Sequence, residues 1–342
     1  MKSLLLQLDG KLPNHALLRL SAHLKGLGHS VVFRRISNPR SIERGIWDHF
    51  DAVYASAIFD WSKPLCERLL EVYPQAIIGG SGWSRTAKLE AIGVAGMEKD
   101  YSIYPNYQNS IGYTQRGCRL KCTFCVVPSM EGAVRPAEPF LSIWRGESYP
   151  RNVVLMDNDF FGLPTWRESI KAMRDGGFKV SFNQGVNSRL FTEESAAAIA
   201  SVKYYDSDFK DRRIYTAWDN TAHEKPLFRG LNALVANGVK PDEIMVYMLI
   251  GNGDSPGDRE YRRAKLREFG CRPYPMPFVR TKELVGFQRW VIRRSDVGKN
   301  AASWADYSAA NYRPEDLVRP DERQLNMFPI IGNVASEVNC LQ

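Results

Sequence analysis

Three cysteines lie close together in the segment Gly112–Cys125, which reads GYTQRGCRLKCTFC in this chain of 342 residues. Cys118, Cys122 and Cys125 have the spacing CxxxCxxC. Thiolates are the ligands that hold iron–sulfur clusters, and a short loop can wrap three of them around one face of a cube. Three protein ligands leave one iron of a four-iron cluster open. The spacing therefore predicts a [4Fe–4S] cluster with a free coordination position.

Zinc and simple core packing are the alternative interpretations of these cysteines. A structural zinc site takes four ligands, usually as two paired knuckles. The sequence has no CxxC or HxxxH partner nearby, and His223 stands alone in the second half of the chain. Core packing would bury Arg119 and Lys121 between the cysteines. Both alternatives are less favoured than the cluster.

Strand and helix patterns alternate in the first hundred residues. Short apolar runs are typical of buried parallel strands, and amphipathic stretches between them are typical of crossover helices. The expected strands are Ser3–Leu8, Ser30–Arg35, Asp51–Phe59 and Ala76–Gly79, and the expected helices are Ala16–Leu27 and Ser62–Val72. The pattern predicts a Rossmann-like, doubly wound parallel sheet with ligands favoured at the C-terminal ends of its strands.

The alternation resumes after an expected linker at residues 98–108. The expected strands are Ile111–Thr114, Val153–Asp157, Val180–Asn183, Ile214–Trp218, Met245–Ile250 and Arg272–Phe278. The expected helices are Thr165–Asp175, Glu193–Ala200, Pro226–Ala236 and Arg259–Phe269. Six β/α units are fewer than the eight of a closed barrel, so we expect a partial (β/α)6 barrel. The predicted fold class is α/β, with a Rossmann-like domain at 1–100, the partial barrel at 101–290 and a helical or irregular C-terminal extension at 291–342.

CxxxCxxC after the first strand of a six-unit barrel resembles the signature of radical S-adenosylmethionine (radical SAM) enzymes, over about residues 108–290. The resemblance implies that Cys118, Cys122 and Cys125 hold a [4Fe–4S] cluster whose open iron binds SAM. It implies reductive cleavage of SAM to a 5′-deoxyadenosyl radical that abstracts hydrogen from a substrate. It also implies an external one-electron reductant of the flavodoxin or ferredoxin type. The sequence does not show whether methyl transfer, rearrangement or another reaction follows.

The same resemblance suggests which residues contact SAM. Phe124, before the third cysteine, corresponds to the aromatic residue that packs against the adenine. Asp157 and Asn158 form the polar turn after the second strand, where the family binds the ammonium group of SAM. The remaining candidates are Asn183 and Gln184 for the ribose hydroxyls, Arg189 for the carboxylate, and Gly251 in a turn that contacts the adenine. Arg suits a carboxylate because its guanidinium can donate two parallel hydrogen bonds.

A Rossmann-like domain before such a barrel resembles the cobalamin-binding class of the family. The cobalt-ligating DxHxxG motif is absent, because His15 has neither the preceding Asp nor the following Gly. Cobalamin is therefore not favoured, and the domain is expected to cap the barrel or hold substrate. Cys66, Cys271 and Cys340 are too few and too scattered for a second cluster.

Composition limits the remaining classes. Hydrophobic residues make up 44% of the chain and charged residues 25%, which excludes a disordered or fibrous protein. No apolar run is long enough to cross a bilayer and no export signal is visible, so we expect no membrane partner and a cytoplasmic location. The net charge of +8 and the basic helix at Arg259–Arg267 are compatible with nucleic acid. Arg262 and Arg263 within this helix are expected to face solvent.

A radical SAM enzyme is therefore the function that the sequence favours. Within enzymes, the rival is radical SAM modification of a nucleic-acid base or nucleoside, which the basic and aromatic residues suggest. The rival from another class is a non-catalytic iron–sulfur or metal-binding protein. A fourth ligand near the cysteines would favour that rival, and the sequence shows none.

Overall fold

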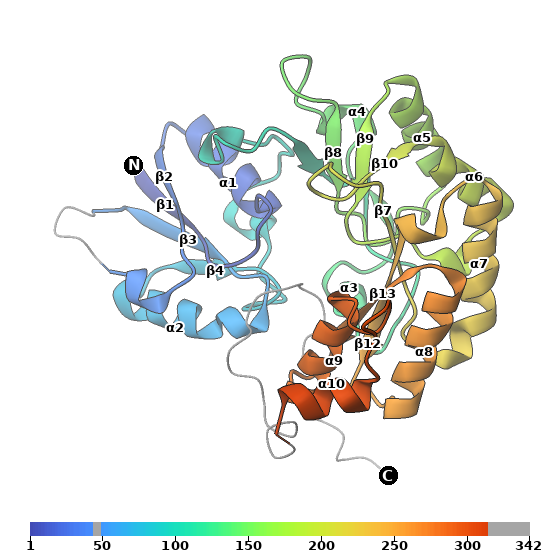
Figure 1. The fold of residues 1–342 in the computed structure, drawn as a ribbon. Helices are drawn as coiled ribbons and strands as arrows, with labels where there is room; N and C mark the ends of the chain where they lie inside the picture. The colour runs from blue at the N-terminus through green and yellow to red at the C-terminus, as the bar shows by residue number, and fades with distance from the viewer. Residues whose placement is uncertain (44–48, 314–342) are drawn as a thin grey trace, which may run out of the picture. The chain divides into compact units, whose positions relative to one another are not determined.

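The computed structural model describes residues 1–43 and 49–313, and its described residues form two compact units (Figure 1). The first unit comprises Met1–Ile111 together with Gly117–Ala133. The second comprises Gly112–Arg116 and residues 134–313. Residues 117–133, which include the three cysteines, thus belong to the first unit, although the residues before and after them in the sequence belong to the second.

The first unit contains a parallel four-stranded sheet in the order β2-β1-β3-β4. Its strands are β1 Lys2–Gln7, β2 Ser30–Arg35, β3 Ala52–Ser56 and β4 Ile77–Gly79. The central strand β1 carries Leu4, Leu5 and Leu6 in succession, and all three are buried. A continuous apolar run fits a strand that is covered on both faces, as crossover helices require.

Two helices make the crossovers of this sheet. Helix α1, His15–Gly26, begins where the Asn14 side chain accepts a hydrogen bond from Leu17 N at 3.1 Å. Such a cap satisfies a backbone donor that the first turn of a helix leaves without an intrahelical partner. Helix α2, Lys63–Val72, places Cys66 and Leu69 in the core of the unit.

The second unit contains two parallel sheets, in the orders β10-β9-β8-β5 and β11-β12-β13. The strands are β5 Ser110–Gly112, β8 Asn152–Leu155, β9 Lys179–Phe182, β10 Lys203–Tyr204, β11 Ile214–Ala217, β12 Ile244–Ile250 and β13 Arg272–Pro277. The helices between and after them are α4 Phe140–Ile143, α5 Trp166–Asp175, α6 Glu193–Ser201, α7 Glu224–Ala236, α8 Pro256–Phe269, α9 Lys282–Ile292 and α10 Trp304–Asn311. A short antiparallel pair joins β6, Gln115–Arg116, to β7, Arg135–Pro136.

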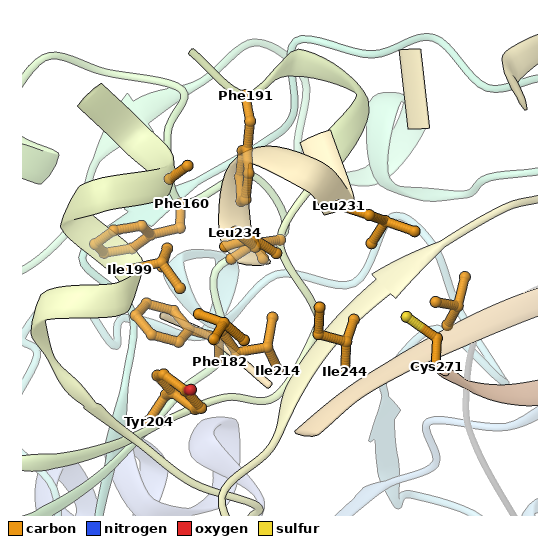
Figure 2. Packing of buried hydrophobic residues seen from close by; sticks show 14 of the residues in the cluster. Phe160, Phe182, Phe191, Ile199, Tyr204, Ile214, Leu231, Leu234, Ile244 and Cys271 are labelled. Atoms are coloured by element: carbon orange, nitrogen blue, oxygen red, sulfur yellow. The ribbon is translucent and has the colours of Figure 1, made fainter. Parts of the chain in front are cut away.

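One large apolar cluster lies between these sheets and their helices (Figure 2). Helix α5 contributes Trp166, Ile170 and Met173, which share one helix face. Strand β12 contributes alternate residues, from Ile244 to Ile250, and therefore presents a single face to this core. Cys271 lies in the same cluster and is buried.

The structure confirms the predicted α/β class with parallel sheets. All ten expected strands overlap observed strands, and the six expected helices overlap α1, α2 and α5 to α8. The sequence missed the two-residue strand β10, the β6–β7 pair and the four-residue helices α3, Val127–Met130, and α4. These pieces are too short to show a periodic pattern. Residues 314–342 of the expected C-terminal extension, including Cys340, lie outside the described residues.

No helix in the described ranges is both long enough and apolar enough to span a membrane.

The first unit offers a direct test of backbone packing at Gly80. Gly80 has a φ of +97°, and a Cβ there would lie 2.2 Å from the carbonyl oxygen of Ala57. Gly28 has a φ of +80° with no atom within 4 Å of a Cβ. We expect Gly28→Ala to cost about 1 kcal/mol for the left-handed backbone alone, and Gly80→Ala to cost at least about 3 kcal/mol because its neighbour is backbone. Urea unfolding of the two variants measures this difference, and equal losses would contradict the predicted contact.

Candidate active site

The cysteine segment is a loop closed by backbone contacts at its two ends. Gly117 N–H donates to the Glu131 carboxylate at 2.8 Å, and Cys118 N–H donates to Gly132 O at 3.4 Å. Gly117 has a φ of +86°, and a Cβ there would lie 2.4 Å from Ala133 O. Glycine is therefore required where the two ends of the loop meet.

The side chains of Cys118, Cys122 and Cys125 are all half-buried. Leu120 N–H donates to Cys118 Sγ at 3.4 Å, and Cys125 N–H donates to Cys122 O at 3.0 Å, which marks a tight turn between the second and third cysteines. Three accessible thiols on one short loop are a donor set that suits an iron–sulfur cluster. The described part of the chain contains no group of three His, Cys, Asp or Glu residues placed to hold a metal ion, so the three thiols do not converge in this structure. Phe124 is half-buried in the same loop.

In the second unit, the end of β8 carries a buried carboxyl group. Asp157 Oδ1 accepts a hydrogen bond from Gln115 N–H at 2.7 Å, and Asp157 Oδ2 accepts one from the Thr114 hydroxyl at 3.1 Å. Burial raises the pKa of the Asp157 carboxyl to about 7, although the hydrogen bonds from Gln115 and Thr114 act to lower it. Asp157 is thus poised to change its protonation state near neutral pH.

Two further polar side chains in this unit are fully buried. Gln115 donates through Nε2 to Phe160 O, while its Oε1 has no hydrogen-bond partner among the described residues. Ser181 on β9 is completely buried, and its Oγ likewise has no partner among them. A buried polar atom without a partner costs about 1–3 kcal/mol. Such atoms are expected where a ligand supplies the missing hydrogen bond.

The turns after β8 and β9 place the other polar candidates. Asn183 N–H donates to Leu155 O at 3.0 Å, so Asn183 continues the pairing of β9 with β8 beyond the end of the strand. Its Nδ2 lies 3.6 Å from Met156 Sδ. Asn158 and Gln184 are half-buried in the same two turns. The structure therefore brings Asp157, Asn158 and Asn183 to neighbouring strand ends.

Arg189 follows the same turn and its guanidinium is held by two neighbours. Nε donates to Asn187 Oδ1 at 3.0 Å, and Nη1 lies 2.8 Å from His223 Nδ1. Arg189 also lies close enough to Asp219 to lower its pKa, but burial dominates and the pKa of Asp219 is raised overall. Sequence analysis missed Asp219 and His223. Asp219 is the second residue after β11, so a polar residue close to a strand end was the signal that could have found it.

The turn after β12 is organised by a carboxylate and a buried arginine. Asp254 Oδ1 accepts hydrogen bonds from Gly251 N–H at 2.5 Å and Asn252 N–H at 3.2 Å. Asp254 Oδ2 accepts one from Arg262 Nη2 at 2.7 Å. Gly251 has a φ of +79°, and a Cβ there would lie 2.4 Å from the Leu284 side chain, so glycine suits this turn in both conformation and space.

The prediction that Arg262 faces solvent is wrong. Its side chain is 1% exposed, and its guanidinium donates to the carbonyl groups of Trp218 and Leu249 as well as to Asp254. Burial lowers the pKa of Arg262 from its ordinary value, while Asp254 and Asp219 act to raise it. The expectation failed because the guanidinium of Arg262 is bound by Trp218, Leu249 and Asp254, which lie in or after β11 and β12 and which helix periodicity does not reveal.

Arg263 and Arg267, on the same helix, are also engaged. Arg263 pairs with Glu260 at 2.6 Å and with Asp296 at 2.8 Å, and Arg267 pairs with Asp296 at 2.9 Å. The Arg263 side chain is mostly buried, so the expectation that it faces solvent is wrong as well.

In the first unit, the residues at the C-terminal ends of the strands form hydrogen bonds with one another. The Asp9 carboxylate, after β1, accepts hydrogen bonds from Ile58 N–H and Phe59 N–H, each at 2.9 Å, and from the Ser62 hydroxyl at 2.8 Å. A Cβ on Gly82 would lie 2.2 Å from Phe59 O, so two loops touch directly at this edge. His15 is buried as the first residue of α1.

The raised pKa of Asp157 predicts how stability depends on pH. The carboxyl has an ordinary pKa of 3.8 and a pKa of about 7 in the folded chain. Between these values the folded state keeps a proton that the unfolded state releases. Stability should therefore fall as pH rises from about 4 to about 7, by up to about 4 kcal/mol from this group.

Asp157→Asn should remove this pH dependence, because the amide does not titrate. Urea unfolding at several pH values between about 4 and 8 measures the slope for the wild type and the variant. Asp242→Asn, at an exposed carboxyl in the same unit, is the control and should keep the wild-type slope. An unchanged slope in Asp157→Asn would show that Asp157 ionises normally.

Comparison with known proteins found no matching protein-family model, no matching curated protein and no matching solved structure. The functional conclusion therefore depends on the residues described above.

Proposed function

We propose that the chain is a radical SAM enzyme in which Cys118, Cys122 and Cys125 hold a [4Fe–4S] cluster. The observation that carries the proposal is the CxxxCxxC loop itself: three half-buried cysteine side chains on a loop between β6 and β7 whose ends meet at Gly117. When bound, such a cluster supplies an open iron for SAM and the electron that cleaves SAM to a 5′-deoxyadenosyl radical. An external reductant of the flavodoxin or ferredoxin type is the proposed source of that electron.

The parallel strand orders support the finer architecture that this function needs. The sheet β2-β1-β3-β4 with crossover helices is consistent with a Rossmann-like module. The strands of the second unit, in two parallel sheets followed by helices, are consistent with a partial barrel. In such folds the C-terminal ends of the strands carry the binding groups, and Asp157, Asn183 and Gly251 all follow strand ends.

The proposed roles at the strand ends follow from donor and acceptor chemistry. Asp157, once ionised, and Gln115 Oε1 are acceptors that suit the ammonium group of SAM. Bringing that cation to the buried carboxyl would lower its raised pKa and favour the ionised form. Asn158, Asn183 and Gln184 can hydrogen-bond the ribose hydroxyls or nearby polar groups of SAM.

Arg189 is proposed to bind the SAM carboxylate. Its hydrogen bonds to Asn187 and His223 orient the guanidinium before a ligand arrives, which reduces the entropy lost on binding. The Gly251 turn and Phe124 are proposed to contact the adenine, the first through backbone groups and the second through its ring.

The rival function, modification of a nucleic acid, receives less support from the contacts. Its main argument was the basic face of helix α8. Arg262 is buried and paired with Asp254, and Arg263 and Arg267 are paired with Asp296. Cations that are already neutralised release few counterions from a nucleic acid. Cobalamin is not proposed, because the strand ends of the first unit are bonded to one another.

The first test of the proposal is iron binding. Anaerobic reconstitution should give about four irons per chain and a brown protein, since a four-iron cluster is held by thiolates. Cys122→Ala should lose both the iron and the formation of 5′-deoxyadenosine from SAM. Cys271→Ala is the control, because its thiol is buried in the core. Stoichiometric zinc without iron, or a stable cluster that leaves SAM intact, would favour the non-catalytic metal-binding rival.

The second test concerns Arg189 and SAM affinity. Arg189→Lys should weaken SAM binding by about 1.5–3 kcal/mol, because lysine cannot donate the paired hydrogen bonds of a guanidinium. Titration calorimetry on the reconstituted protein measures the affinity, and iron content should not change. The matched control is Arg167→Lys, at an exposed pair with Glu194 in the same unit. Equal affinity in wild type and Arg189→Lys would remove Arg189 from the SAM site.

A further inference from the structure

The chain that follows β4 reaches the cysteine loop through a lysine side chain. In residues 80–96, which we call the β4 loop, Lys88 Nζ donates a hydrogen bond to Met130 O at 2.6 Å. Met130 is the last residue of α3, the short helix that begins two residues after Cys125. The β4 loop and residues 117–133 belong to the same compact unit. The contact therefore lies inside the first unit.

The start of the β4 loop is attached to the first sheet. Gly82 N–H donates to Ala57 O, directly after β3, at 3.0 Å. Ser81 Oγ donates to Ile58 O at 2.7 Å. A Cβ on Gly80 would lie 2.2 Å from Ala57 O, so the two backbones are in direct contact. These contacts fix the direction in which the loop leaves β4.

The end of the β4 loop is attached to helix α1 by a buried arginine. The Arg19 guanidinium donates through Nε to Gly96 O at 2.8 Å and through Nη2 to Val94 O at 3.3 Å. Nη2 also pairs with Glu90 at 3.4 Å. The backbone that carries Lys88 is thus held on both sides. An exposed lysine ordinarily contributes little, because fixing its contact costs conformational entropy. A backbone that is already ordered reduces that cost.

The acceptor of this hydrogen bond lies at a point that controls the cysteine loop. The last carbonyl groups of a helix have no intrahelical partner and carry partial negative charge, which a lysine ammonium satisfies. The next residue after Met130 is Glu131, whose carboxylate accepts the hydrogen bond from Gly117 N–H at the base of the loop. On the other side, α3 leads back to Cys125. Met130 O therefore lies between the base of the loop and its third cysteine.

We propose that Lys88 is a positioning residue for the cysteine loop, so that the first unit serves as the scaffold of the cluster site. The inference rests on the proposed function, which supplies the reason for holding three thiols in place. Lys88 acts through α3: it holds Met130 O, and the helix carries this constraint to Cys125. The first unit then has a role that requires no ligand of its own.

Loss of iron to a chelator tests the inference in the reconstituted protein. Lys88→Met keeps an unbranched side chain and removes the donor. Iron should leave this variant about three to ten times faster than the wild type, the effect of one lost hydrogen bond. Lys88→Arg keeps a cationic donor and should restore most of the retention. The decay of the visible absorbance in EDTA, under anaerobic conditions, measures the rate.

The controls separate positioning from general stability. Arg85→Met removes another exposed cation of the β4 loop and should lose iron at the wild-type rate. Urea unfolding of the cluster-free protein should be nearly the same for Lys88→Met and the wild type, because the Lys88 side chain is exposed.

Three results would overturn the inference and leave the proposed function intact. The first is equal iron loss from Lys88→Met and the wild type. The second is an equal acceleration in Lys88→Met and Arg85→Met. The third is faster iron loss that only follows a lower urea midpoint of the whole chain. A wild type that takes up no iron contradicts the proposed function itself.

Thiol reactivity provides a second readout that needs no iron. Iodoacetamide labels accessible thiols in the cluster-free protein, and peptide mass spectrometry reads the rate at Cys122 and Cys125. Lys88→Met should speed labelling at both positions, because a loop with fewer contacts opens more often. Cys66 is buried in the core of the same unit and serves as the internal reference. Unchanged labelling of Cys122 and Cys125 would show that Lys88 does not hold the loop.

Discussion

The hydrogen bonds around Asp157 are the constraint on which the geometry of the candidate site depends. A carboxyl group this deeply buried is costly unless it is protonated or receives donors. Gln115 N–H and the Thr114 hydroxyl provide them, and they tie the end of β8 to the segment that runs into the cysteine loop. The β6–β7 pair begins at Gln115, so the same contact fixes where the loop leaves the sheet. One carboxyl thus links the end of β8 to the start of the cysteine loop.

A second buried charge organises the other sheet in a similar way. Arg262 donates to two backbone carbonyls at the ends of β11 and β12 and to Asp254. Removing one member of a buried ion pair costs more than the pair contributes, because the remaining charge stays buried. The buried pair of Arg262 and Asp254 is therefore explained better by its role in positioning the Gly251 turn than by a gain in the free energy of unfolding. Both sheets use an ionisable side chain at the C-terminal ends of their strands.

The elements were predictable from the sequence because their patterns are local. The run IMVYMLI of β12 and the spaced apolar residues of α5 identify a strand and a helix without tertiary information. Arg262 could not be placed in this way, since its partners are set by strand order and not by helix periodicity. Gln115 and Ser181 are ordinary polar residues in the sequence, and only the structure shows that an oxygen of each is buried with no hydrogen-bond partner in the described part of the chain. The polar residues at strand ends, such as Asp157, lie between these cases: their position was predictable, but their burial was not.

In the cysteine loop, too, the spacing of the residues was known from the sequence, but the positions of their side chains were not. The short spacing of the cysteines allows three thiols to reach one metal site. Whether the thiols converge depends on what they bind, because metal binding and local folding are coupled. The contacts of Gly117 with Glu131 and of Cys118 with Gly132 close the loop at its base. All three thiols between these contacts keep partial exposure, while Val127 is buried. In the proposed cluster-bound state, a closed base with accessible thiols would confine the rearrangement of the three side chains to the interior of the loop.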